Sequence, residues 1–336
     1  MKPLSRVLGS LLASFSLLSL LLSLLLSLFA AGASPALAQT YPNKPIRLVV
    51  PFGAGGGTDI LSRIVMTKMQ ESLGQAFIFD NRPGANTIIG AEQVAKAAPD
   101  GYTLLITLDM TMTMNPSLYS RLPYNPEKDF VPVGMVAATP VIFITQSKQP
   151  WMTLQDFISH VRANPGKLTY GAGAIISQVV GEQLLRAAKI DMVYTNYKGG
   201  GQALQALLAG DIQFSIMDIA TVTPALKDGR LRGLAVSGDR REPTLPNVPT
   251  IRESGYPELE YKDWWAVYAP AGTPRAVVDR LNAEIAKAMQ DPKVRARLAD
   301  LSFHPNHSSP EQQLRQQRED AQRWDKVIKA AGIKLD

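Results

Sequence analysis

Short apolar runs alternate with segments of helical periodicity along most of the chain from residue 46 onward. Several of these runs are almost continuously apolar and rich in β-branched residues, which is typical of strands buried on both faces. The predicted strands are Ile46–Val50, Phe77–Phe79, Thr103–Thr107, Val141–Thr145, Leu168–Tyr170, Val193–Tyr197, Ile212–Met217, Leu234–Ser237 and Trp264–Ala269. The helical segments between them are Asp59–Leu73, Thr87–Ala97, Leu154–Ala163, Gln178–Ala188 and Gln202–Leu208. This alternation predicts an α/β fold with mostly parallel sheets flanked by helices.

The chain after residue 272 is predicted to be helical. Thr273-Pro274, Asp291-Pro292 and Ser309-Pro310 each place a capping side chain before a proline at the first helical position. We expect the last helix to pack back on the first part of the fold as a brace. Its apolar stripe consists of Leu314, Ala321, Trp324 and Ile328.

Two segments, Asn115–Val133 and Asp239–Glu260, are rich in proline, asparagine and charged residues and have no clear periodicity. The second is predicted to cross between two lobes. The expected organisation is therefore a first lobe, a central insert and a return of the chain to the first lobe.

The first 38 residues have the three parts of a secretory signal peptide. Lys2 and Arg6 precede an apolar Leu/Ser stretch from Leu11 to Phe29, and Ala36-Leu37-Ala38 ends the segment. The apolar stretch approaches the length of a membrane anchor, which is the alternative interpretation. The Ala-x-Ala site favours cleavage after Ala38 and hence export to the periplasm.

Composition narrows the possible classes of protein. The 336 residues are 46% hydrophobic and 19% charged, which suits about two globular domains. No cysteine is present, which excludes disulfides, thiolate metal sites, a cysteine nucleophile and a lipid-anchored N-terminus. The net charge of +6 comes without any basic cluster, so nucleic acid is not an expected partner.

The most informative motif follows the first predicted strand. Residues 53–57 read Gly-Ala-Gly-Gly-Gly, and Thr58 or Asp59 is expected to open a helix. Glycines let backbone N–H groups approach a ligand, and the helix N-terminus favours an anion such as a carboxylate. A P-loop is excluded because its lysine is missing, whereas a dinucleotide fingerprint fits Gly53 and Gly55 but has Thr58 in place of its third glycine. A tight turn without a ligand is the third interpretation.

A second turn of this kind, Gly171–Ser177, lies between a predicted strand and a predicted helix, and Lys198–Gly201 is a third. The second turn falls in the predicted second lobe, so two helix N-termini could face one cleft. That arrangement would suit a dicarboxylate, or one carboxylate held from both sides.

The sequence contains few candidates for catalytic residues. His304 and His307 lie near a turn without a partnered glutamate, and His160 lies in a predicted helix. No Gly-x-Ser-x-Gly motif is present, and no acidic pair has a supporting motif. The sequence therefore predicts no catalytic residues, no metal and no cofactor.

Many segments between residues 41 and 334 resemble, in order, the Bug-type (TctC-like) substrate-binding proteins of tripartite tricarboxylate transporters. The segments that carry the resemblance include Tyr41-Pro42-x-Lys44-Pro45-Ile46, Val49-Val50-Pro51-Phe52-x-x-Gly55-Gly56-x-x-Asp59, Asn81-Arg82-Pro83-Gly84-Ala85, Pro99-Asp100-Gly101-Tyr102, Leu245-Pro246-Asn247-Val248-Pro249-Thr250 and Ala269-Pro270-Ala271-Gly272-Thr273-Pro274. The resemblance implies a two-lobe periplasmic binding protein fold of type II with a hinge and no chemistry of its own. The expected lobes are residues 39–143 plus 256–336 and residues 144–255.

The resemblance also implies which residues bind the ligand. Two loops would grip its carboxylate through backbone amides and water, and two strand ends would line the rest of the cleft. The second loop has Ile175 and Ile176 where the family usually has small polar residues, so the pocket is expected to be drier there and to prefer an apolar or aromatic acid. Asp109 would disfavour a polyanion and tolerate an ammonium group, unless it is an exposed loop acid. The expected site residues are Phe52, Gly53, Ala54, Gly55, Gly56, Gly57, Thr58, Asp59, Thr107, Asp109, Gly171, Ala172, Gly173, Ala174, Ile175, Ile176, Ser177 and Asp218.

The resulting hypothesis is a monomeric periplasmic receptor. It would capture a dicarboxylate, amino acid or aromatic acid between its lobes and deliver it to the membrane permease of a tripartite transporter. Two alternatives stay open: a sensor that presents its closed form to a membrane signalling protein, and a nucleotide-dependent enzyme.

Overall fold

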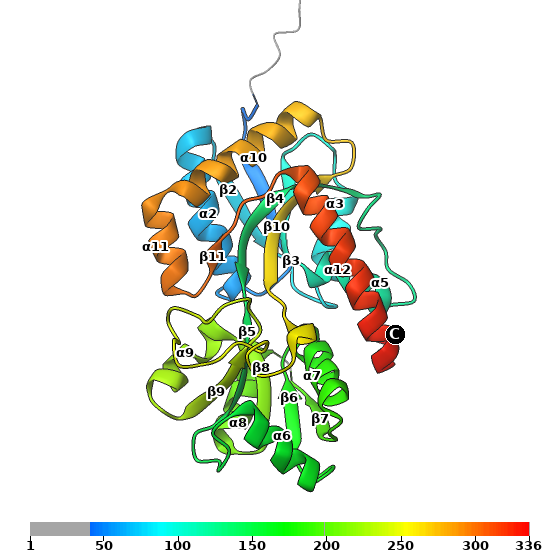
Figure 1. Ribbon diagram of the computed structural model, residues 1–336. Coiled ribbons are helices and arrows are strands. Elements are labelled where there is room, and N and C mark those ends of the chain that lie inside the picture. Colours follow the sequence, from blue (N-terminus) through cyan, green and yellow to red (C-terminus); the bar gives the residue numbers. More distant parts are fainter. Residues whose placement is uncertain (1–40, 198, 336) are drawn as a thin grey trace, which may run out of the picture. The chain divides into compact units, whose positions relative to one another are not determined.

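A computed structural model describes residues 41–197 and 199–335, and the predicted signal peptide with its cleavage site lies outside them. The chain from Lys44 onward forms one compact unit, to which the following description applies. Its strands form two separate sheets (Figure 1). Each sheet and the helices packed on it are called a lobe below.

The first lobe contains a six-stranded sheet in the order β11-β4-β10-β3-β1-β2. Strands β2, β1 and β3 run parallel, whereas β10 is antiparallel to β3 and to β4, and β11 is antiparallel to β4. The strands are β1 (Ile46–Val50), β2 (Phe77–Asn81), β3 (Thr103–Leu108), β4 (Phe130–Thr139), β10 (Asp263–Pro270) and β11 (His304–Pro305). The helices are α2 (Gly57–Leu73), α3 (Ile88–Ala95), α4 (Met110–Thr113), α5 (Asn115–Leu118), α10 (Arg275–Gln290), α11 (Pro292–Asp300) and α12 (Pro310–Ala331).

The second lobe contains a five-stranded sheet in the order β7-β6-β8-β5-β9. Again three strands, β7, β6 and β8, are parallel, and β5 is antiparallel to β8 and β9. The strands are β5 (Val141–Gln146), β6 (Thr169–Ala172), β7 (Val193–Asn196), β8 (Phe214–Asp218) and β9 (Leu231–Val236). The helices are α6 (Leu154–Ala163), α7 (Ile175–Ala188), α8 (Gly200–Ala209) and α9 (Ile219–Lys227).

The two-lobe α/β fold predicted from the sequence is confirmed. Each sheet has the parallel strands that strand–helix alternation predicts, and each adds antiparallel strands where the chain passes between the lobes. The apolar interior is divided in the same way. One cluster packs around Val49, Leu105 and Tyr268 in the first lobe, and another around Ile144 and Leu207 in the second. Within the described residues, no helix combines the length and apolar character needed to cross a membrane.

The chain passes between the lobes at two neighbouring places. Strand β4 ends at Thr139 and β5 begins at Val141, so a single residue, Pro140, joins the two sheets. The return path runs from the end of β9 through a short 3₁₀ turn, Pro257–Leu259, to the start of β10. Figure 1 shows these connections at the junction of the two lobes.

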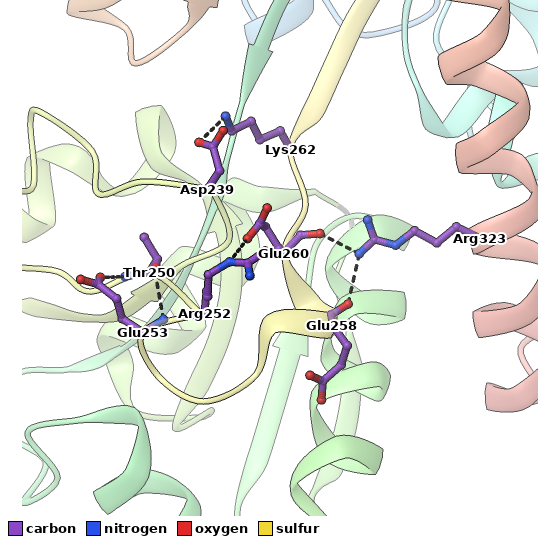
Figure 2. Close-up of polar contacts among 8 residues, drawn as sticks. All are labelled: Asp239, Thr250, Arg252, Glu253, Glu258, Glu260, Lys262 and Arg323. Atoms are coloured by element: carbon purple, nitrogen blue, oxygen red, sulfur yellow. Dashed lines mark hydrogen bonds and ion pairs between the residues drawn. The ribbon is translucent and has the colours of Figure 1, made fainter.

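Helix α12 braces the return path. It packs on β4 of the first lobe and also contacts α7 of the second. Its Arg323 guanidinium donates to the backbone carbonyls of Glu260 at 2.8 Å and of Glu258 at 3.3 Å (Figure 2). An ion pair between Lys262 and Asp239, at 2.6 Å, joins the two ends of the same path.

We expect Arg323→Ala to loosen this path. The substitution removes two hydrogen bonds to backbone carbonyls, which should lower the free energy of unfolding by about 1–2 kcal/mol and speed hydrogen exchange in residues 257–262. Arg318→Ala on the same helix is the control. It breaks an exposed ion pair with Glu127 and should cost less than about 0.5 kcal/mol. Equal exchange rates in the two variants would contradict the bracing role.

Candidate functional site

A cavity of about 540 Å³ opens between the carboxyl ends of the parallel strands of both lobes. Its volume is suited to a small organic ligand, and its position follows the rule that α/β sheets bind ligands at those strand ends. The first lobe contributes Pro51, Phe52, Gly53, Ala54, Gly56, Gly57, Thr58, Pro83, Gly84, Asn86, Thr87, Leu108, Met110 and Asp263. The second lobe contributes Val141, Gly173, Ala174, Ile175, Ile176, Ser177, Gly199, Gly200, Ile216, Met217, Asp218 and Thr221.

The glycine-rich loop after β1 is shaped by Asp59. The carboxylate of Asp59 accepts the backbone N–H of Gly55 at 2.9 Å, and it also pairs with Arg63 and Asn81. Burial alone would raise the pKa of Asp59, but these hydrogen bonds outweigh burial and lower it. Gly55 has a φ of +78°, which favours glycine, and neither it nor Asp59 lines the cavity. Both hold the loop in place instead.

The glycine turns of the second lobe pack backbone against backbone. A Cβ added to Gly173 would lie 2.3 Å from the carbonyl carbon of Gly199 and 2.5 Å from the nitrogen of Gly200. Only glycine at position 173 therefore permits the turn after β6 to meet the turn after β7. Lys198, the first residue of the third predicted turn, lies outside the described residues.

Three of the longer helices that begin at the cavity lack side-chain caps, whereas Asp109 caps the one-turn helix α4 by accepting the N–H of Met110. The N-cap residues of α2, α7 and α8 are Gly56, Ala174 and Gly199, and none of them provides a capping hydrogen bond. Away from the cavity, side chains cap α6, α11 and α12, whereas α10 begins without a side-chain cap. The first N–H groups of a helix have no partner within it, so these three helix starts leave donors and a partial positive charge at the cavity from both lobes.

The loop after β2 also reaches the cavity, and sequence reasoning did not assign it to the site. Three successive residues there, Ala85, Asn86 and Thr87, have positive φ angles. Such strain persists where the surroundings enforce it and is common at binding sites. A chain of buried hydroxyls supports this loop, because Thr87 contacts Thr111 at 2.7 Å and Thr111 contacts Thr107 at 2.6 Å. The signal available in the sequence was Pro83-Gly84, a second glycine turn after a first-lobe strand.

Two carboxylates also line the cavity. Asp218 ends β8 and its side chain is accessible to solvent, whereas Asp263 begins β10 and has no exposed surface. Neither carboxylate oxygen of Asp263 has a hydrogen-bond partner among the described residues. Burial raises the pKa of Asp263 to about 8, and the neighbouring charge of Asp218 adds to the effect. The protein atoms around Asp218 partly desolvate its carboxyl and raise its pKa as well, although the side chain reaches solvent in the cavity.

Asp109 lies behind the cavity. It is fully buried, accepts the N–H of Met110 at 2.8 Å and accepts the hydroxyl of Tyr261. Burial raises the pKa of Asp109 well above its usual range, and the Asp263 charge raises it further. Leu108 and Met110, its chain neighbours, line the cavity instead. Asp109 is therefore not an exposed loop acid.

Most of the expected site residues meet at this one cavity. Those that do not line it are Gly55, Asp59, Thr107, Asp109, Gly171 and Ala172. Gly171 and Ala172 belong to β6 and are buried in the sheet, where Gly171 accepts the hydroxyl of Ser215 at 2.7 Å. Ile175 and Ile176 both line the cavity and are more than nine-tenths buried.

The histidines lie away from the cavity. His304 pairs with the buried Glu242 at 2.9 Å, and the rings of His160 and Trp151 are 4.7 Å apart. In the part of the chain that is described, no group of three or more His, Asp or Glu side chains is arranged to hold a metal ion. A smaller cavity of about 250 Å³ beside the return path is lined by charged side chains that already pair, including Lys262, Asp239 and Arg323.

Known proteins with the same architecture support a family assignment. The sequence profile of the tripartite tricarboxylate transporter family receptor matches residues 61–333. Protein BugT of Bordetella pertussis is 36% identical over 308 residues, which cover 90% of this chain and 94% of BugT. An R. palustris protein solved with adipate is 33% identical, with a TM-score of 0.81, and the match covers 88% of this chain and 99% of that one. MatC from Rhodopseudomonas palustris, solved with bound malate, is 32% identical, with a TM-score of 0.77 and coverage of 86% and 100%. This chain thus belongs to the tripartite tricarboxylate transporter family receptors, the Bug-type solute-binding proteins.

Proposed function

We propose that this protein is a periplasmic receptor that captures a small carboxylate in the cavity between its lobes and performs no chemistry on it. One observation carries the proposal: helix starts without side-chain caps converge on one cavity from both lobes. Their N–H groups and partial positive charges are complementary to a carboxylate, which no basic side chain among the described lining residues would otherwise hold.

Two relatives support the ligand class, because solved structures of family members similar to this chain carry adipate and malate. Both compounds are small dicarboxylates. The predicted signal peptide and the family both support a periplasmic location.

The proposed mechanism is closure of one lobe on the other. The moving bodies are the two lobes, divided at Pro140 rather than at the expected residue 143. The connections at Pro140 and along residues 237–262 act as the hinge. A ligand that touches both lobes gains all its contacts only in the closed form, so binding shifts the population toward closure. The closed form then docks on a membrane permease of the tripartite tricarboxylate type. A sensor role would use the same closure, with a membrane signalling protein as the partner.

The ligand can be identified directly. We expect mass spectrometry to find a small carboxylate released when the protein, purified without refolding, is denatured. Calorimetry with a panel of carboxylates should give saturable binding for at least one compound, with 1:1 stoichiometry. Saturable binding of NAD with no carboxylate binding would overturn the proposal and favour a nucleotide-dependent enzyme.

Gly53 offers a side-chain test of the same site. A Cβ at Gly53 meets no atom within 4 Å, and its φ is not positive, so Gly53→Val should fold normally and add bulk beside the cavity. We expect affinity for the identified carboxylate to fall by at least tenfold. Gly201→Val, also in open space but outside the cavity lining, should bind as well as the parent protein. Equal affinity in all three proteins would argue against the loop after β1 as the carboxylate site.

A further inference from the structure

The two cavity carboxylates come from different lobes and meet at the shortest connection between them. Asp263 pairs with Thr139 in the first sheet, and Asp218 pairs with Val141 in the second. Thr139 and Val141 are separated only by Pro140, so the strand registers bring both acids beside the same crossing of the chain. Each acid therefore follows its own lobe when the lobes move.

No basic side chain offsets the charge of either acid, although Asp218 is the N-cap residue of α9 and lies at the positive end of that helix. No lysine, arginine or histidine occurs among the described residues that line the cavity. The nearby Tyr261 hydroxyl has a single proton, which it donates to Asp109. Both oxygens of Asp263 are buried without any hydrogen bond among the described residues. A buried carboxylate in this state is costly for the protein unless it is protonated or a ligand supplies the missing donors.

The cavity is consequently bipolar. The helix starts of α2, α7 and α8 provide hydrogen-bond donors, and Asp218 and Asp263 provide acceptors. A simple dicarboxylate carries negative charge at both of its ends, so one end would meet the two acids. A ligand with a carboxylate and a protonated amine can place the carboxylate at the helix starts and the amine at the acids. A metal ion would fit the two acids less well than an ammonium group does, because the described residues offer no third acidic or histidine ligand there.

We propose that the ligand is zwitterionic, with its carboxylate at the helix starts and its ammonium group between Asp218 and Asp263. The inference rests on the proposed function, since it assumes that the cavity binds a carboxylate. The ammonium group would supply the donors that Asp263 lacks and would bridge acids of both lobes, which would repel each other if both were ionised without it. Closure would therefore be favoured by an amino-acid-like ligand over a plain acid of the same length.

Proton linkage follows from the proposal. The groups that face Asp263 are Asp218, Asp109 and Tyr261, with Asp320 of α12 behind Asp109. Since the pKa of Asp263 is raised to about 8, the unliganded protein holds a proton there at pH 7. An ammonium group favours the ionised carboxylate, so binding should release a proton. Affinity should rise with pH from 6 to 8, by up to about tenfold per pH unit.

The test compares matched ligands by calorimetry at pH 7 in buffers of different ionisation enthalpy. The probes are glycine, 4-aminobutanoate and 6-aminohexanoate, each beside the monocarboxylate and the dicarboxylate of the same carbon number. The proposal expects an amine-bearing member to bind at least tenfold more tightly than its partners, with proton release. Asp218→Asn and Asp263→Asn should each reduce that preference to less than threefold, with folding checked by thermal unfolding.

The possible outcomes separate this inference from the proposed function. Tighter binding of dicarboxylates, with proton uptake, would overturn the proposal of a zwitterionic ligand and would leave the proposed function as a carboxylate receptor standing. An amine preference that survives both substitutions would also overturn the assignment of the two acids. If calcium bound to the parent protein and no amine-bearing probe did, the acid pair would be a cation site instead. Binding of no carboxylate in any series would contradict the proposed function, and the inference with it.

Discussion

Asp263→Asn is expected to make the unliganded protein more stable, and the gain should grow as the pH rises from about 4 to 8. The pKa of Asp263 is raised from the model-peptide value of 3.8 to about 8 by burial and by Asp218. Between these two values the folded protein holds a proton that the unfolded chain has lost, so the parent protein loses stability with rising pH. Asparagine does not titrate and escapes this loss. The difference should reach roughly 3–5 kcal/mol above pH 8.

Urea unfolding of both proteins across this pH range measures the effect. Asp239→Asn provides the control, because Lys262 holds the pKa of the Asp239 carboxyl below its ordinary value. That variant should show the opposite sign, with a small loss of stability near neutral pH. If the free energies of unfolding of the parent protein and of Asp263→Asn change in parallel from pH 4 to 8, the pKa of the Asp263 carboxyl is not raised in the folded protein.

Gly173→Val is expected to abolish ligand binding and to destabilise the second lobe. The added side chain would collide with the backbone of Gly199 and Gly200, so the turns after β6 and β7 must separate. Separation displaces the starts of α7 and α8, and the donors they present move apart. We expect affinity to fall at least a hundredfold and the free energy of unfolding to fall by about 2–4 kcal/mol.

Gly201→Ala is the matched control for this change, since a Cβ there meets no atom within 4 Å. It should bind ligand like the parent protein. Hydrogen exchange would locate the damage, with faster exchange expected in 171–177 and in the first turn of α8. Unchanged affinity in Gly173→Val would show that the contact between the two turns is dispensable for the site.

Sequence periodicity located the strands that are continuous and apolar, and it missed those whose residues break the pattern. Strand β4 contains Pro132 and Gly134, and both are unfavourable within a strand. Its pairing with β10 contains irregularities in register, and one of them lies beside Pro132. Helix α9 was missed in the same way, because Pro224 lies within it. In both cases packing in the lobe outweighs local preference.

The candidate site divides along similar lines. Glycine turns at strand ends are local features, and the loops after β1 and β6 that they predict do line the cavity. Asp263 gave no local signal, because it opens an apolar strand and becomes part of the cavity only through pairing with Thr139. Asp109 was expected in the site from the resemblance, yet α4 begins at Met110 and Asp109 lies beneath it. Such placements depend on long-range register, which one sequence does not reveal.

The uncapped helix starts have a consequence for how ligand preference can change among related receptors. A donor made of backbone N–H groups does not titrate and survives side-chain substitutions that leave the glycine turns in place, so most point mutations around the cavity leave the carboxylate-binding groups intact. Positions 175, 176, 218 and 263 line the same cavity with side chains, so a single substitution there changes the chemical character of the cavity wall. Receptors encoded by duplicated copies of such a gene could therefore come to prefer different chemical groups at the other end of the ligand, while each still binds a carboxylate.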